Sequence, residues 1–166
     1  MEQTSSGDAR HDRPRRRRAG NEIKAALRDL RIQLALLNHQ VGGKLALKDV
    51  DLDCLDVLAR SGPLTPSALA RQAGLHPATL TGILDRLERG GWISRDRARG
   101  DRRSVSIRVL PDRGVEVFRL YRPMITAMDE VLDGYSEEEL DVIAGFLRRS
   151  TEAGRTANEK VAGQDS

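Results

Sequence analysis

Aromatic residues, cysteine and long apolar runs are all scarce in this chain of 166 residues. Five aromatic residues are too few for an aromatic-lined nucleotide or sugar groove, so the core must be aliphatic. No apolar run approaches the roughly 18 residues that span a bilayer. A single cysteine, Cys54, excludes an internal disulfide and a multi-cysteine zinc site. We therefore expect a soluble, cytoplasmic protein with no membrane partner.

Patterns typical of catalysis or metal binding are missing as well. The three histidines, His11, His39 and His76, do not have the spacing of metal ligands. The sequence has no recognisable set of nucleophile, base and acid, and no glycine-rich phosphate loop. We expect no catalytic residue, no metal and no cofactor, which makes an enzyme the least favoured class.

Positive charge is concentrated in the middle of the chain. Residues 66–109 hold 9 arginines against 4 acidic residues, whereas residues 110–166 hold 7 basic residues against 12 acidic ones. This polarity favours a protein that presents one face to a polyanion and keeps its other end away from it. Arginine makes up 24 of the 28 basic residues, which suits phosphate chemistry but is equally explained by GC-rich coding.

Amphipathic helices are predicted at both ends of the folded region. Residues 1–20 carry Arg15–Arg18 but almost no apolar side chain, so we expect a disordered basic arm there. Helices are expected over about 21–42 and 112–153, with residues 156–166 as a frayed tail. Their apolar stripes have alternating spacings of four and three residues, as in paired helices. These stripes predict a homodimer interface formed by Ile23, Leu27, Leu30, Leu34, Tyr121, Ile125, Met128 and Leu132.

The middle of the chain has the signals of a helix-turn-helix followed by a hairpin. Thr65-Pro66 and His76-Pro77 each read as a helix start, and Gly74 separates the two short helices. Residues 92–95 and 104–109 read as strands joined by a glycine-containing loop. The predicted fold class is mainly α with a small β-hairpin wing, in which a winged helix-turn-helix (about 48–110) is flanked by dimerisation helices.

The stretch LTPSALARQAGLHPATLTGILDRLERGGWISRDRARGDRRSVSIRVLPDRG resembles the MarR family of bacterial winged-helix transcription regulators. Three features carry the resemblance: the helix-Gly-helix run ending in D-R-L-E-x-x-G, the wing motif Asp101-Arg102-Arg103, and the step from Leu110 through Gly114 into a long helix. The resemblance covers about residues 21–155 as one domain. It implies that the terminal helices form the dimer, that the second helix of the motif enters the major groove, and that the wing contacts the minor groove or backbone.

Candidate DNA contacts follow from the small outward side chains of the second helix and from the arginines of the wing. Thr79 and Thr81 can hydrogen-bond to bases or phosphates, and Arg86 can reach phosphate or guanine. Narrow minor grooves attract inserted arginine, and Asp101 is expected to hold one wing arginine in place. The predicted recognition-helix contacts are Pro77, Ala78, Thr79, Thr81, Gly82 and Arg86, and the predicted wing contacts are Arg97, Arg99, Asp101, Arg102 and Arg103.

These observations predict a homodimeric, sequence-specific DNA-binding regulator that reads a two-fold symmetric operator in double-stranded DNA. The resemblance further implies a repressor released by a small lipophilic or phenolic effector. The alternative is a winged-helix module that binds protein and contacts nucleic acid only through the arginine-rich arm, because fold alone does not fix function. We expect Cys54 to be an inert thiol, since Asp53 and Asp56 nearby would raise its pKa.

Overall fold

The computed structural model describes residues 8–97 and 105–163, which form six helices and two strands. Among these residues, no helix combines the length and the apolar character needed to cross a membrane. The chain divides into two compact units, residues 1–118 and 119–166. The elements are α1 (Asp8–Leu45), α2 (Asp49–Ser61), α3 (Pro66–Ala73), α4 (Pro77–Arg89), β1 (Ile93–Arg97), β2 (Val105–Val109), α5 (Pro111–Leu132) and α6 (Glu137–Ala162).

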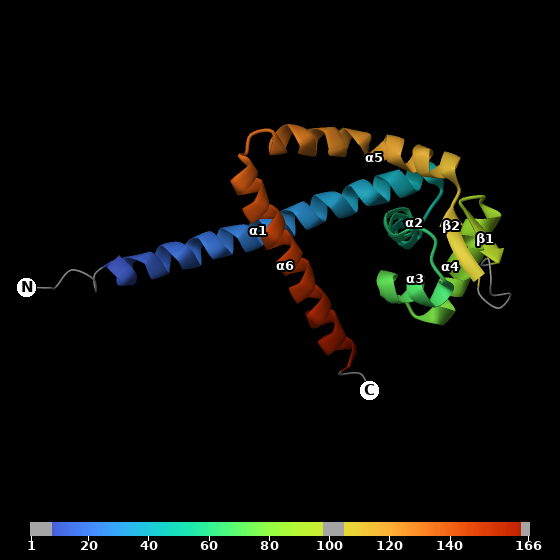
Figure 1. Cartoon of the computed structure of the whole chain (residues 1–166), viewed down its shortest axis with the longest axis horizontal. Coiled ribbons are helices and arrows are strands. Elements are labelled where there is room, and N and C mark those ends of the chain that lie inside the picture. Colours follow the sequence, from blue (N-terminus) through green and yellow to red (C-terminus); the bar gives the residue numbers. More distant parts are fainter. Residues whose placement is uncertain (1–7, 98–104, 164–166) are drawn as a thin grey trace, which may run out of the picture. The chain divides into compact units, whose positions relative to one another are not determined.

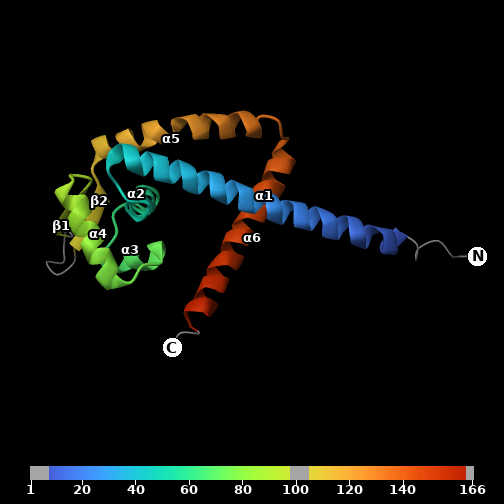
Figure 2. The same ribbon diagram turned by 180° about the vertical axis from the view of Figure 1, so that it is seen from behind.

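The predicted winged helix-turn-helix is confirmed in the first unit. Helices α2, α3 and α4 and the hairpin gather at the C-terminal end of α1, as both views show (Figure 1 and Figure 2). Thr65 caps α3 by accepting a hydrogen bond from the Ala68 backbone at 3.3 Å. Gly74 ends α3 in the left-handed conformation (φ 65°), which lets α4 begin at Pro77. The local signals in the sequence therefore placed both helices of the motif correctly.

The hairpin is antiparallel and is extended by one further pairing. Ile93 lies opposite Val109, and Arg97 lies opposite Val105. Leu64, in the segment before α3, exchanges two backbone hydrogen bonds with Ile107 at 2.8 and 3.0 Å. This third pairing attaches the hairpin to the start of the helix-turn-helix, so the wing is anchored on the domain core.

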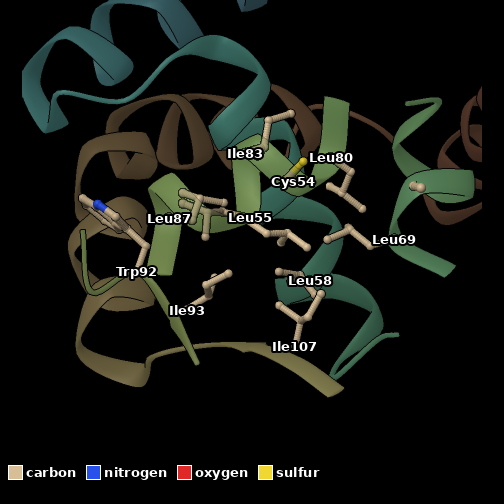
Figure 3. Packing of buried hydrophobic residues seen from close by; sticks show 12 residues of the cluster. Cys54, Leu55, Leu58, Leu69, Leu80, Ile83, Leu87, Trp92, Ile93 and Ile107 are labelled. Carbon is tan, nitrogen blue, oxygen red and sulfur yellow. The ribbon is translucent and has the colours of Figure 1, made fainter. Parts of the chain in front are cut away.

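The core of the winged domain is aliphatic, as the shortage of aromatic residues predicts. Leu52, Leu55 and Leu58 of α2 are all buried. Leu55 and Leu58 meet side chains of α3, α4 and the hairpin in one cluster, and Trp92 lies at its edge (Figure 3). The central side chains of this cluster are Cys54, Leu55, Leu58, Leu69, Leu80, Ile83, Leu84, Leu87, Ile93 and Ile107.

The prediction of a disordered arm over residues 1–20 is wrong for residues 8–20, which form the first turns of α1. Residues 1–7 lie outside the described part of the chain. Residues 15–19 are arginines and alanine, which propagate an established helix at little cost, whereas Pro14 lies inside the helix and disfavours its extension further toward the N-terminus. The side chains of Arg15–Arg18 are exposed, and Arg18 pairs with Glu22 one turn later at 3.0 Å.

Two predicted helix ends also need correction. Helix α1 does not stop at Gly42-Gly43 but continues to Leu45. A Cβ atom at Gly42 would lie 2.7 Å from the Leu47 carbonyl oxygen, so this glycine allows the following turn to pack against the helix. Helix α5 starts at Pro111, within one residue of the predicted start at about 112. The predicted frayed tail is helical as far as Ala162, since helix formers follow the capping box of Ser136 and Glu139 that starts α6.

Candidate nucleic-acid interface

Helix α4 is fixed to the domain by one fully occupied face. Leu80, Ile83, Leu84 and Leu87 are each at most 3% exposed. His76 caps the start of the helix, since its Nδ1 accepts a hydrogen bond from the Ala78 backbone at 3.3 Å, and Pro77 takes the first helical position. Because the apolar stripe is saturated by the core, the opposite face of α4 is directed to solvent.

The outward face of α4 carries only small side chains along its first two turns. Pro77, Ala78, Thr79, Thr81 and Gly82 are all exposed, as the sequence predicted. A Cβ atom at Gly82 would meet nothing within 4 Å. The Thr81 hydroxyl donates to the Pro77 carbonyl at 3.1 Å, and its oxygen can still accept a hydrogen bond from a base or phosphate-bound group. A helix whose outward face has no bulky side chains can approach base edges closely.

Arg86 is held by a buried carboxylate of α2, and its predicted DNA contact stays a prediction. Its Nη2 donates to Asp51 Oδ1 at 2.5 Å, and its Nε donates to Asp51 Oδ2 at 3.0 Å. The Asp51 side chain is 0% exposed and also accepts a hydrogen bond from the Lys48 backbone at 2.9 Å. Hydrogen bonding to Asp51 raises the pKa of the Arg86 guanidinium. Two of the three guanidinium nitrogens, Nε and Nη2, thus attach α4 to α2.

The wing is described only up to its base. Arg97 is the last residue of β1, whereas Arg99, Asp101, Arg102 and Arg103 lie outside the described residues. At the base, Arg108 donates to Asp96 across the strands at 2.6 Å, which lowers the pKa of the Asp96 carboxyl. This ion pair joins the two strands on one face of the hairpin.

Arg95 ties the wing to α4. Its Nη2 donates to Asp85 Oδ1 at 2.5 Å. Its Nε lies 3.1 Å from Glu88 Oε2, close enough for an ion pair although the N–H is not aligned for a hydrogen bond. Both acidic residues belong to the D-R-L-E run. Because Arg95 lies between them, it offsets two negative charges on the helix that would otherwise repel a polyanion.

The comparisons with known proteins agree with this geometry. A sequence model of the MarR family matches residues 47–105. Over 118 residues the chain is 32% identical to YcgE of Bacillus subtilis (strain 168), an uncharacterized HTH-type transcriptional regulator, and the match covers 70% of this chain and 77% of YcgE. The chain belongs to the MarR family of DNA-binding transcriptional regulators.

Solved structures of the MarR family share its fold. A MarR family protein from Bacillus stearothermophilus superimposes with a TM-score of 0.65 at 24% identity, covering 84% of this chain and 97% of that protein. NadR in complex with 4-hydroxyphenylacetate superimposes with a TM-score of 0.61 at 23% identity, covering 76% of this chain and 90% of NadR. These likenesses concern the fold, and the individual DNA contacts assigned above stay predictions.

The side chains of the predicted dimer interface are largely uncovered in the single chain. Ile23, Leu30 and Leu34 of α1 are 46, 38 and 43% exposed, and Ile125, Met128 and Leu132 of α5 are 38, 38 and 36% exposed. Leu27 and Tyr121 are partly buried. Ile32 and Leu36 of α1 are also exposed, at 45 and 52%, but they lie off the four-three stripe and outside the predicted interface.

Cys54 is buried within this MarR-family domain. Burial, followed by the carboxylates of Asp51 and Asp53, raises the pKa of its thiol to about 11. At pH 8 a pKa raised from 9.0 to about 11 lowers the thiolate fraction about 100-fold. We therefore expect a disulfide reagent such as DTNB to react with the native protein at least about 100-fold more slowly than with the denatured chain. Complete labelling of the native protein within seconds would contradict an inert thiol.

Proposed function

We propose that this chain is a homodimeric repressor that reads a two-fold symmetric operator in the cytoplasm. The observation that carries the proposal is the small, exposed face of α4, held outward by a buried stripe on the other side of the same helix. One helix and one wing bury too little surface for the affinity of an operator-binding protein. A dimer overcomes this limit by placing two recognition helices about one helical turn of DNA apart.

The repressor is proposed to be released by a small lipophilic anion. The support is the family membership together with one structural neighbour, NadR, which was solved in complex with 4-hydroxyphenylacetate. We therefore propose a phenolic acid as the class of effector. Thermal unfolding with and without such phenolic acids tests this directly, because a ligand that binds the native protein raises its midpoint.

The proposed contacts divide into two kinds. Thr79 and Thr81 on α4, with Pro77, Ala78 and Gly82 beside them, are assigned to base edges in the major groove. Arg97, Arg99, Arg102 and Arg103 of the wing are assigned to phosphates and the minor groove, with Asp101 holding the loop. This division gives each kind of residue a different experimental signature.

Thr81→Ala and Arg102→Ala should therefore differ in kind. We expect Thr81→Ala to cost about 1–3 kcal/mol at particular base pairs, because its hydroxyl oxygen can accept a hydrogen bond from a base. Arg102→Ala should weaken binding to most sequences and make the salt slope shallower by about one unit, because it releases one counterion fewer. Titration of both variants against an operator and its single-base variants at several salt concentrations measures the two effects.

The chain offers a matched control for the threonine. Thr151 on α6 is exposed and its hydroxyl donates to the Leu147 carbonyl at 2.9 Å, the same one-turn bond that Thr81 makes. Thr151→Ala should leave base preference unchanged. If Thr81→Ala weakens all sequences equally and Arg102→Ala alters base preference at a constant salt slope, the two groove assignments are reversed.

A further inference from the structure

The corner between α4 and α5 is closed by a single residue, Trp92. Its backbone N–H donates to the Leu87 carbonyl in the last turn of α4 at 2.9 Å. Its carbonyl accepts a hydrogen bond from the backbone N–H of Leu110, the residue before α5, also at 2.9 Å. One peptide segment thus joins the end of the recognition helix to the start of the helix that carries a predicted dimer stripe.

The indole ring of Trp92 fits this corner closely. The residue is 6% exposed and lies at the edge of the core cluster (Figure 3). A Cβ atom at Gly90 would lie 2.8 Å from Cδ1 and 3.0 Å from Nε1 of the ring, so any side chain at position 90 would collide with it. Gly91 has a φ of 67°, which favours glycine. The run Gly90-Gly91-Trp92 is therefore needed to fold the ring back under the end of α4.

Arg113, in the first turn of α5, covers the outer side of the same ring. Its Cζ lies 4.6 Å from the centroid of the Trp92 ring, within cation–π distance. Nη2 donates to the Gly90 carbonyl at 3.4 Å, and Nη1 donates to Glu116 Oε2 at 2.7 Å. The guanidinium therefore contacts the end of α4, the indole ring and the next turn of α5 at once, although the side chain is 39% exposed.

We infer that Arg113 and Trp92 form a clamp that fixes the direction of the first turns of α5 relative to the recognition helix α4. Through this direction, the clamp sets the spacing between half-sites that the dimer accepts. This inference rests on the proposed function, because spacing has meaning only for a dimer on a two-fold operator. Helix α5 has 22 residues and is about 33 Å long. Pro123 lies inside this helix, so we consider only the roughly 15 Å from Arg113 to Arg122, over which a rotation of a few degrees displaces the end by about 1 Å in each protomer. One base pair of spacing corresponds to about 3.4 Å along DNA. A loosened corner is therefore expected to weaken the preference of the dimer for one half-site spacing over the next.

The test compares Arg113→Met with the unmodified protein on duplexes of altered spacing. The reference duplex is selected from a random library by the unmodified protein, and the others carry one base pair more or fewer between the half-sites. We expect Arg113→Met to reduce the preference for the reference spacing about 3- to 10-fold while the salt slope stays constant. We also expect the emission of Trp92, the only tryptophan of the chain, to shift to longer wavelength.

Two further variants make the result decisive. Arg113→Lys keeps a cation over the ring but loses the planar guanidinium that bonds to two groups at once. It should therefore retain more of the spacing preference than Arg113→Met does. Arg119→Met removes an exposed positive charge from the same helix and should change neither emission nor spacing preference. Full spacing preference in Arg113→Met, with altered emission, would overturn the clamp and leave the proposed function standing. Absence of any spacing preference in the unmodified protein would overturn both.

Discussion

Replacing Arg86 by methionine should destabilise the protein by about 3 kcal/mol, because the change leaves a buried carboxylate without its cation. Asp51 is 0% exposed and both of its oxygens accept hydrogen bonds from Arg86. Methionine fills a similar volume, so the loss reports on the charge and its hydrogen bonds and only slightly on packing. Urea denaturation followed by circular dichroism measures the difference in the free energy of unfolding.

A second variant and a neighbouring arginine make this experiment specific. Asp51→Leu combined with Arg86→Met should recover most of the loss, since an apolar pair removes the uncompensated charge. It should remain about 1 kcal/mol short, because Asp51 also accepts the Lys48 backbone N–H. Arg89→Met is the control, because the Arg89 side chain is exposed and its Nε donates to a carbonyl of its own helix. Unchanged stability in Arg86→Met, with weaker DNA binding and a shallower salt slope, would assign Arg86 to the DNA interface.

Leu30→Glu should convert the protein to a monomer and weaken operator binding by more than about 100-fold. The reason is that Leu30 is 38% exposed in the single chain, whereas the proposed dimer buries it, and a buried unpaired carboxylate is costly. Light scattering at micromolar concentration should give about 37 kDa for the unmodified dimer, twice the chain mass of 18.4 kDa, and about 18 kDa for the variant.

The control for the dimer lies on the same helix. Leu36 is 52% exposed but lies off the stripe formed by Ile23, Leu27, Leu30 and Leu34. Leu36→Glu should leave both the mass and the operator affinity unchanged. If Leu36→Glu dissociates the protein and Leu30→Glu does not, the interface uses the other face of α1.

Local signals explain why the helix-turn-helix could be predicted from the sequence. Thr65-Pro66 and His76-Pro77 act on the next few residues alone, and Gly74 supplies a left-handed conformation that few other residues adopt. The buried stripe of α4 follows from the helical period by itself. The outward face then consists of the α4 residues outside this stripe, among them Thr81 and Gly82.

Features that depend on contacts between distant residues could not be predicted in the same way. Asp51 and Arg86 are 35 positions apart, and only the packing of α2 against α4 brings them together. From the sequence Arg86 is predicted to lie on the outward face of its helix, and nothing in the local pattern pairs it with Asp51. The contact of Arg113 with Trp92 is of the same kind, since it forms only when the hairpin returns the chain to the end of α4.

Hydroxyl-radical footprinting of the selected duplex tests the proposed function most directly. We predict two blocks of protection related by a two-fold axis, with centres about one helical turn or 10 base pairs apart, and two chains bound per duplex. The blocks should be lost at half-sites whose contacted bases are changed, and they should persist when the flanking sequence is changed. Uniform protection that ignores sequence, or a single block with one chain per duplex, would contradict a dimer that reads an operator through α4.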